Sequence, residues 1–382
     1  MNKAVNHPTM SLDEVVRPTV VEVDTNALKN NFYSIKNYIG MTKIMPILKA
    51  NAYGHGLIST AQLYQQIKAD YLGVAVVEEG ILLRQNGITI PILVLGGIWG
   101  NQIPLFLKYD LTITASSIDK LNQIDQTAAS MKTKAKVHLK IDTGMERIGV
   151  HYYSAEKFIE TAHKFKNIFI EGIYSHFANA DSDDLSETKL QLERFQSVLN
   201  YLQKYSVNIP LKHISNSAAI VQMPEANFDL VRPGILLYGV YPSEKIKKNI
   251  SVKPALTWKS RVVYFKVIRA GDSVGYGSKW RSDHQIRAVT VPVGYGDGYF
   301  RSLSNKSEVI IRSKKYPVIG TVSMDQIVVN IESDSAFNGD EVILLGEDGK
   351  EKISAADLAQ LAGTIPYEIL TNINTRVPRI YK

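Results

Sequence analysis

The sequence contains no cysteine. Disulfide frameworks, thiolate nucleophiles and zinc–thiolate sites are therefore excluded, and we expect no metal centre. Long apolar runs are also missing, because the most apolar stretch, residues 88–99, is too short to span a bilayer and contains Pro91 and a glycine pair. Residues 1–16 carry no apolar run of the signal-peptide type. We therefore expect a cytoplasmic protein without a membrane partner.

Neither sign of charge dominates the chain. The 44 Lys and Arg residues stand against 37 Asp and Glu residues, a formal charge of +7. The short cluster of Lys245, Lys247 and Lys248 is typical of a solvated loop. A protein that reads nucleic acid would more often show a basic stripe with a matching motif, so no nucleic-acid partner is expected. With 382 residues that are 45% hydrophobic, the chain is long enough for a large domain and a smaller one.

The first two-thirds of the chain alternate short apolar runs with helical patterns. Candidate strands are residues 43–50, 71–77, 91–97, 111–116, 136–142, 168–176, 211–215 and 230–238. Most intervals between them have the spacing of an amphipathic helix, most clearly residues 185–205. Eight such units predict an α/β fold with an N-terminal (β/α)8 TIM barrel. A doubly wound open sheet competes, but residues 49–56 lack the Gly-rich fingerprint expected after its first strand.

The pattern changes after about residue 249. Strand-like runs separated by Gly, Asp and Asn turns follow at residues 255–268, 285–293, 307–312, 317–331 and 341–345, with a short helix at 354–361. We therefore predict a barrel in residues 1–249 and a β-rich C-terminal domain in residues 250–382. Residues 19–24 look like an additional strand, and we expect residues 1–24 to pack with the second domain.

Polar residues stand at the predicted ends of the barrel strands, where barrel enzymes place their chemistry. These residues are Lys49, Lys140, Asp142, His176, Asn216, Ser217 and Arg232. A single lysine in such a place is usually a solvated charge, but agreement among five strand ends predicts a site.

Lys49 follows the apolar residues 44–48. Partial burial would lower the pKa of its amine and free it for Schiff-base chemistry. Pyridoxal 5′-phosphate needs such a lysine, a phosphate cradle and a partner for its pyridine nitrogen. Residues 215–218 and 232–235 offer a hydroxyl and turn N–H groups, and Arg232 can face the nitrogen. The pattern therefore indicates pyridoxal 5′-phosphate as the cofactor.

Residues 49–56, KANAYGHG, resemble the cofactor-lysine motif of bacterial alanine racemases. The resemblance covers nearly the whole chain after about Arg17. Its further motifs are residues 140–149 (KIDTGMERIG), 175–178 (SHFA), 216–218 (NSA), 231–235 (VRPGI), 274–277 (VGYG), 294–298 (GYGDG), 323–325 (SMD) and 375–379 (TRVPR). That family combines a barrel with a β-domain and works as a homodimer with active sites at the subunit interface.

The resemblance implies a role for each matching residue. Lys49 would carry the cofactor as a Schiff base and act as one of two catalytic bases, with Tyr276 of the partner subunit as the other. Cofactor contacts are implied for Tyr53, Arg147, His176, Asn216, Ser217, Arg232, Gly234, Ile235 and Tyr367. Substrate contacts are implied for Arg147, Tyr276, Tyr295 and the backbone N–H of Met324. Lys140 matches a lysine that is commonly N6-carboxylated.

The implied reaction is the interconversion of L- and D-alanine, which supplies D-alanine for peptidoglycan. A racemase for serine or a broader set of amino acids remains the main alternative, because a hydrophobic pocket discriminates only modestly against an added hydroxyl. An amino-acid decarboxylase with the same barrel and β-domain is disfavoured, because such enzymes use a catalytic cysteine and this chain has none. A non-catalytic cofactor-binding barrel would lack residues 250–382.

Overall fold

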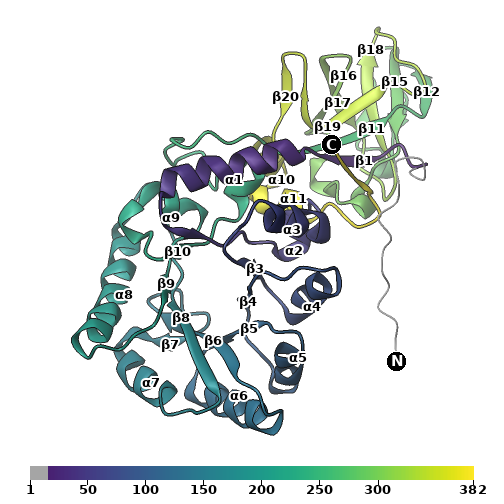
Figure 1. Cartoon of the computed structure of the whole chain (residues 1–382). Coiled ribbons are helices and arrows are strands. Elements are labelled where there is room, and N and C mark those ends of the chain that lie inside the picture. The colour runs from purple at the N-terminus through teal and green to yellow at the C-terminus, as the bar shows by residue number, and fades with distance from the viewer. Residues whose placement is uncertain (1–15) are drawn as a thin grey trace. The chain divides into compact units, whose positions relative to one another are not determined.

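The structure of the protein is a computed structural model that describes residues 16–382. The expectation about a signal peptide falls almost entirely on residues 1–15, which lie outside the described residues. The chain divides into two compact units (Figure 1). One is Ala27–Lys253, and the other is Pro254–Lys382 together with the segment that ends at Asn26.

The unit Ala27–Lys253 is built on a closed ring of parallel strands. In ring order they are β2 (Lys43–Ile44), β3 (Leu72–Val74), β4 (Ile92–Val94), β5 (Thr112–Ala115), β6 (Ala135–Asp142), β8 (Ile168–Tyr174), β9 (Leu211–His213) and β10 (Leu230–Val231). Single bridges, Ile47 to Gly73 and Asn216 to Arg232, join β2 to β3 and β9 to β10, and β10 pairs with β2. The short β7 (Val150–His151) pairs with β6. Strands β3, β4 and β5 are buried throughout, as expected of a barrel covered by helices.

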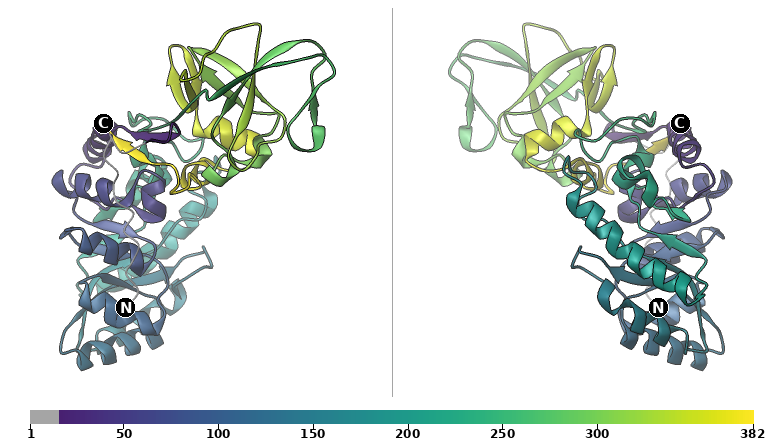
Figure 2. Two further views of the ribbon diagram at one scale, coloured as in Figure 1. Left: turned by 90° about the vertical axis from the view of Figure 1, so that its right-hand side faces the viewer. Right: turned by 90° about the vertical axis from the view of Figure 1, so that its left-hand side faces the viewer.

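Helices lie outside this ring (Figure 1). They are α1 (Thr25–Ile39), α2 (Lys49–Tyr53), α3 (Leu57–Gln66), α4 (Val77–Gln85), α5 (Ile103–Lys108), α6 (Ile118–Ser130), α7 (Ala155–Ala162), α8 (Ser186–Lys204) and α9 (Ser217–Gln222). The teal helix α8 runs along the outer face of the barrel in both views of Figure 2. It forms because Leu192, Phe195 and Leu202 recur at helical spacing and are buried together.

The second unit is dominated by one sheet. Its strands are β1 (Val20–Val23), β11 (Leu256–Arg261), β12 (Tyr264–Ile268), β15 (Ile286–Val291), β16 (Glu308–Ile311), β17 (Lys314–Ile319), β18 (Ile327–Glu332), β19 (Glu341–Asp348), β20 (Glu351–Ile353) and β21 (Arg379–Tyr381). Strand β1 pairs antiparallel with β11 and parallel with β21. A separate hairpin is formed by β13 (Ser273–Val274) and β14 (Trp280–Arg281), and the helices are α10 (Ala355–Ala362) and α11 (Pro366–Thr371). The predicted (β/α)8 barrel followed by a β-rich domain is confirmed.

Several predicted strands were wrong in length. Residues 43–50 form a strand only at Lys43–Ile44, and α2 begins at Lys49. Residues 230–238 form a strand only to Val231, because Pro233 cannot donate a ladder hydrogen bond, and Ile235–Tyr238 make a 3-10 turn. Residues 255–268 form two strands, since Val262 donates to Asp340 while Val263 donates to Thr290. Residues 317–331 are divided by a loop that begins at Gly320, whose φ is +75°.

No helix in residues 16–382 is long and apolar enough to cross a membrane.

Candidate active site

Lys49 is the first residue of α2, a short left-handed turn that follows the first barrel strand. Ala50, Asn51 and Ala52 have φ of 53°, 55° and 52° with ψ near the same values. Side chains with a Cβ rarely adopt this conformation, which costs about 1–2 kcal/mol per residue. Contacts hold it in place: Ala50 N–H donates to Glu79 Oε1 at 2.7 Å, and Leu57 N–H donates to Asn51 Oδ1 at 2.9 Å. The lysine is thus presented on a strained segment, as functional groups often are.

Replacing Ala50 by glycine should stabilise the protein. The exposed Ala50 side chain packs little, and glycine adopts positive φ without strain, so we expect the free energy of unfolding to rise by about 0.5–1 kcal/mol. Ala129→Gly is the matched control, since Ala129 is exposed in the right-handed helix α6 and glycine there should lower stability by up to about 1 kcal/mol. Urea unfolding measures both. A loss of stability in Ala50→Gly would show that the turn is not strained.

The surroundings of Lys49 favour its neutral amine. Solvent reaches the side chain, yet the surrounding protein desolvates the amine and lowers its pKa below the ordinary value. The charges of Arg147 and Arg232 lower it further, while Glu79 opposes them. A neutral amine is the form that attacks a carbonyl and accepts a proton.

Tyr53, Ser217 and Gly234 meet near the carboxyl ends of β9 and β10. The Gly234 N–H donates to the Ser217 hydroxyl at 2.8 Å. A Cβ on residue 234 would stand 2.4 Å from the Tyr53 hydroxyl, so only glycine allows this approach. Ile235 is fully buried beside them. Asn216 caps α9, because its side chain accepts from the N–H groups of residues 218 and 219.

The Arg232 guanidinium is buried with 3% exposure. It donates to His213 Nδ1 at 2.6 Å and to His176 Nδ1 at 3.1 Å. Burial, followed by the charge of Arg232, lowers the pKa of His176 well below its usual range. His176 is therefore neutral, and since its Nδ1 accepts from arginine, its proton is on Nε2.

Lys140 and Asp142 project from β6, next to the loop that carries Arg147. Burial alone would raise the pKa of Asp142, but the backbone N–H groups of Gly144 and Glu146 outweigh it and lower that pKa. Its carboxylate also accepts from Met145 and Arg147. Asp142 thus shapes the loop that presents Arg147, a role that spacing alone did not predict.

The other predicted residues belong to the second unit. Tyr276, Tyr295 and Met324 are 73%, 44% and 51% exposed there. Two hydrogen bonds join the Tyr295 loop to the Met324 loop, from Tyr295 N–H to Ser323 O at 3.0 Å and from Gly296 N–H to Met324 O at 2.9 Å. Tyr367 lies in α11.

Asp297 forms ion pairs that connect the Tyr295 loop to the Met324 loop through Arg376. The sequence did not reveal this role. The fully buried carboxylate pairs with Arg17 at 2.7 Å and with Arg376 at 3.4 Å. Arg376 in turn pairs with Asp325, the neighbour of Met324, at 2.7 Å. The GYGDG and TRVPR motifs contain Asp297 and Arg376, so the signal was present, but spacing does not show that they are partners.

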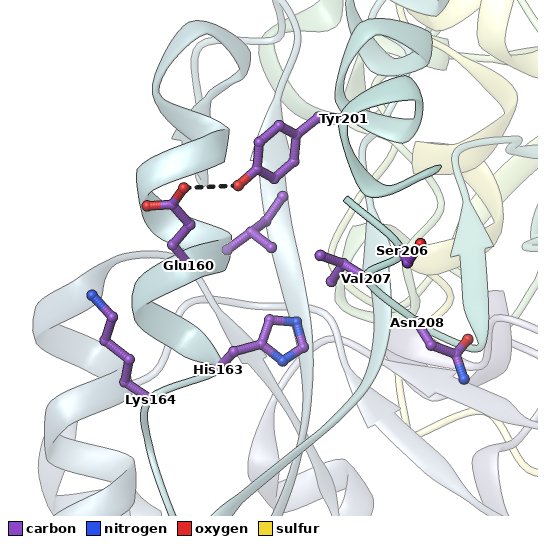
Figure 3. Close-up of a pocket in the computed structure, with 8 residues that line it drawn as sticks. Glu160, His163, Lys164, Tyr201, Ser206, Val207 and Asn208 are labelled. Carbon is purple, nitrogen blue, oxygen red and sulfur yellow. Dashed lines mark hydrogen bonds between the residues drawn. The ribbon is translucent and has the colours of Figure 1, made fainter. Parts of the chain in front are cut away.

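A shallow groove outside the barrel is separate from these residues (Figure 3). It lies between α7 and the end of α8, where Tyr201 donates to Glu160 at 2.9 Å. The other lining residues are Ile159, His163, Lys164, Ser206, Val207 and Asn208. None of the predicted site residues contributes to it.

Comparisons with known proteins agree with this arrangement. The family model described as "Alanine racemase, N-terminal domain" matches residues 23–242, and "Alanine racemase, C-terminal domain" matches residues 255–381. An alanine racemase of Halothermothrix orenii is 44% identical over 370 residues, 96% of this chain and 98% of that protein.

Solved structures are similar over the same extent. An alanine racemase from Clostridium difficile 630 has a TM-score of 0.92 and 39% identity, covering 96% of each chain. One from Bacillus anthracis with bound L-Ala-P has a TM-score of 0.90 and 34% identity, covering 96% of this chain and 95% of that one. The chain therefore belongs to the alanine racemase family and is a racemase, that is, an isomerase.

Proposed function

We propose that this protein interconverts L- and D-alanine, with pyridoxal 5′-phosphate as cofactor and Lys49 and Tyr276 as two bases. The observation that carries the proposal is the position of Lys49 after the first barrel strand in a chain of this family, and the lowered pKa of its amine agrees with it. The proposed role in the cell is to supply D-alanine for peptidoglycan in the cytoplasm.

The barrel residues fit the cofactor. The lowered pKa of the Lys49 amine suits covalent attachment, and the close approach of Tyr53 to Gly234 makes a cradle that any Cβ would fill. The Ser217 hydroxyl and the backbone of residues 234 and 235 would hold the phosphate, together with Tyr53, Asn216 and Tyr367. Arg232 would face the pyridine nitrogen and keep it unprotonated, since arginine is a donor only. The bound cofactor would withdraw electrons from the substrate α-carbon and make its proton acidic.

Racemisation requires proton removal on one face of the α-carbon and proton return on the other, which two bases accomplish most simply. The Lys49 amine would serve one face and the Tyr276 phenolic oxygen the other. His176 has its proton on Nε2, so it would donate to that oxygen. Arg232 sustains this tautomer by donating to Nδ1 at 3.1 Å.

The exposure of Tyr276, Tyr295 and Met324 supports a homodimer with active sites at the subunit interface. We propose that residues 1–249 bind the cofactor and that residues 250–382 of the partner subunit supply Tyr276. Arg147 and the Met324 N–H would bind the substrate carboxylate, and Tyr295 would line the entrance.

Lys140 is proposed to be N6-carboxylated. It is 4% exposed, and burial together with the charge of Arg232 lowers its pKa to about 7. A much larger part of this amine is then neutral at pH 7 than of an ordinary lysine, whose pKa is about 10.4. The nitrogen would attack carbon dioxide and lose a proton, giving an anion that would orient Arg147.

We expect a ¹³C NMR carbamate signal when the protein is equilibrated with labelled carbon dioxide, and it should grow as the pH rises through about 7. Lys140→Arg should abolish it, whereas Lys43→Arg, at an exposed lysine of β2, should not. An unmodified Lys140 under saturating carbon dioxide would contradict the proposal.

A chiral assay of the purified protein against a panel of L-amino acids, with and without added cofactor, tests the function. D-alanine should form fastest. Equal or faster racemisation of serine would favour the alternative, a serine or broad-specificity racemase. No turnover of any amino acid with cofactor present would refute the proposed function.

A further inference from the structure

Arg232 is a buried cation without an adjacent anion. Besides the two histidines, it donates to the carbonyl oxygens of Ser175 at 2.7 Å and Ile214 at 2.9 Å. No carboxylate among residues 16–382 forms a salt bridge with it. Burial of a charge is costly unless a partner compensates it, so the location of its counter-charge matters.

A pair of histidines continues from Arg232 into the barrel. Since Arg232 can only donate, His213 Nδ1 must accept, and the proton of neutral His213 is on Nε2. That nitrogen lies 2.8 Å from His138 Nδ1 and therefore donates to it. His138 must then carry its own proton on Nε2. Both rings are fully buried, and burial lowers the pKa of each, which keeps them neutral.

Glu171 lies at the far end of this chain of contacts, which runs from Arg232 through His213 and His138. His138 Nε2 has no hydrogen-bond partner among the described residues, and the nearest anion is Glu171 Oε2 at 3.6 Å. The same oxygen accepts from the Tyr71 hydroxyl at 2.5 Å. Burial would raise the pKa of Glu171, but its contacts with His138 and Tyr71 outweigh burial and lower it. Glu171 is therefore an anion.

The line runs through the interior of the barrel. His138 is on β6 and His213 on β9, which are separated by β8, so their rings can meet only inside the ring of strands. Gly172 of β8 makes room for this contact, because a Cβ there would stand 2.5 Å from His138 Nδ1. Tyr71 precedes β3, across the barrel from Glu171. The path is thus built by several strands rather than by one local turn.

We propose that Glu171 is the counter-charge of Arg232, coupled to it through the fixed tautomers of His213 and His138, and that it is a positioning residue for this guanidinium. The cation donates at one end and the anion attracts a proton at the other, so each imidazole has one allowed orientation. The part of this inference that concerns the cofactor rests on the proposed function, because only there does Arg232 face the pyridine nitrogen. The coupling itself does not depend on it.

Histidine ¹⁵N NMR of the holoenzyme tests the coupling. In the native protein both rings should show protonated Nε2 and unprotonated Nδ1, with signals assigned from His138→Gln and His213→Gln. Glu171→Gln removes the charge that faces the His138 Nε2 proton, so the ¹⁵N signal of this nitrogen should shift, while the tautomers stay fixed from the Arg232 end. The kcat for alanine should fall about tenfold, as when an outer partner of an active-site group is removed, while KM changes little.

Two further variants make the result specific. Glu171→Asp keeps the charge but moves it away from His138 by the length of one methylene. The His138 signal should therefore shift by less than in Glu171→Gln. Tyr71→Phe removes a hydrogen bond to the carboxylate but keeps the charge, so the His138 Nε2 signal should remain near its native position. If Glu171→Gln loses thermal stability but keeps the native His138 Nε2 signal and the native kcat, Glu171 has only a structural role and the proposal fails. If Glu171→Gln does not fold, an unshifted His138 signal in Glu171→Asp overturns it equally. Absence of racemase activity in the native protein would instead refute the proposed function.

Discussion

Tyr276→Phe should lower alanine racemisation by about 10³-fold, within the range usual for loss of a general base. The variant keeps the ring and removes only the oxygen that would exchange the proton. Because Tyr276 is 73% exposed on its own unit, the change should not disturb folding. Lys49 and the barrel are untouched, so the absorbance of the bound cofactor should remain.

Proton exchange in heavy water makes the prediction sharper. With one base removed, Lys49 can still take the α-proton from its own face and return deuterium to that face. One enantiomer of alanine should therefore exchange its α-hydrogen without inversion, while the other exchanges far more slowly. Tyr205→Phe is the control, since Tyr205 is 57% exposed at the end of α8. Full racemisation by Tyr276→Phe would show that Tyr276 is not the second base.

The architecture could be predicted because buried parallel strands have a simple signature. Residues 72–74 and 92–94 are apolar on both faces and are separated by helical patterns, so repetition along the chain indicates a barrel. The interruptions were harder to predict. Residues 317–331 are mostly β-branched and apolar, yet Gly320 and the Ser323 turn divide them into two strands. The hydrogen-bond partners of the backbone change at this point, and the apolar character of the side chains does not show which partners a strand has.

The left-handed turn at residues 50–53 could not be predicted from local propensity. Ala50 and Ala52 are strong formers of right-handed helix, and they adopt positive φ only because surrounding groups, including Glu79, hold them. The motif match located the lysine without revealing this conformation. Propensity fails most readily where tertiary contacts impose strain.

The interior of the site was predicted only in part, for a related reason. Arg232 and His176 were singled out as polar residues at the strand ends and as parts of the family motifs. Glu171 and His213 lie within predicted strands and resemble ordinary buried or surface residues in sequence. The role proposed for them rests on contacts between strands that are not neighbours, such as His138 with His213 at 2.8 Å. A single sequence contains no direct record of such contacts.

Lys49→Ala should lower the rate of racemisation by at least about 10⁴-fold, because both the covalent anchor and one base are lost. Borohydride reduction of the native protein should fix the cofactor on the peptide that contains Lys49, and the variant should yield no labelled peptide there. Lys43→Ala, at an exposed lysine of β2, should keep the label and the activity. Labelling of another lysine in the native protein would show that the anchor is misassigned.

Mixing the two inactive variants tests whether the bases come from different subunits. In a dimer of one Lys49→Ala chain and one Tyr276→Phe chain, one site would carry both lesions and the other would be intact. Random exchange makes half of the dimers mixed, with one of two sites active, so about a quarter of native activity should return. If both bases came from the same chain, every site would retain one lesion and no activity would return. Recovery after mixing is therefore the outcome that only a site shared between subunits can produce.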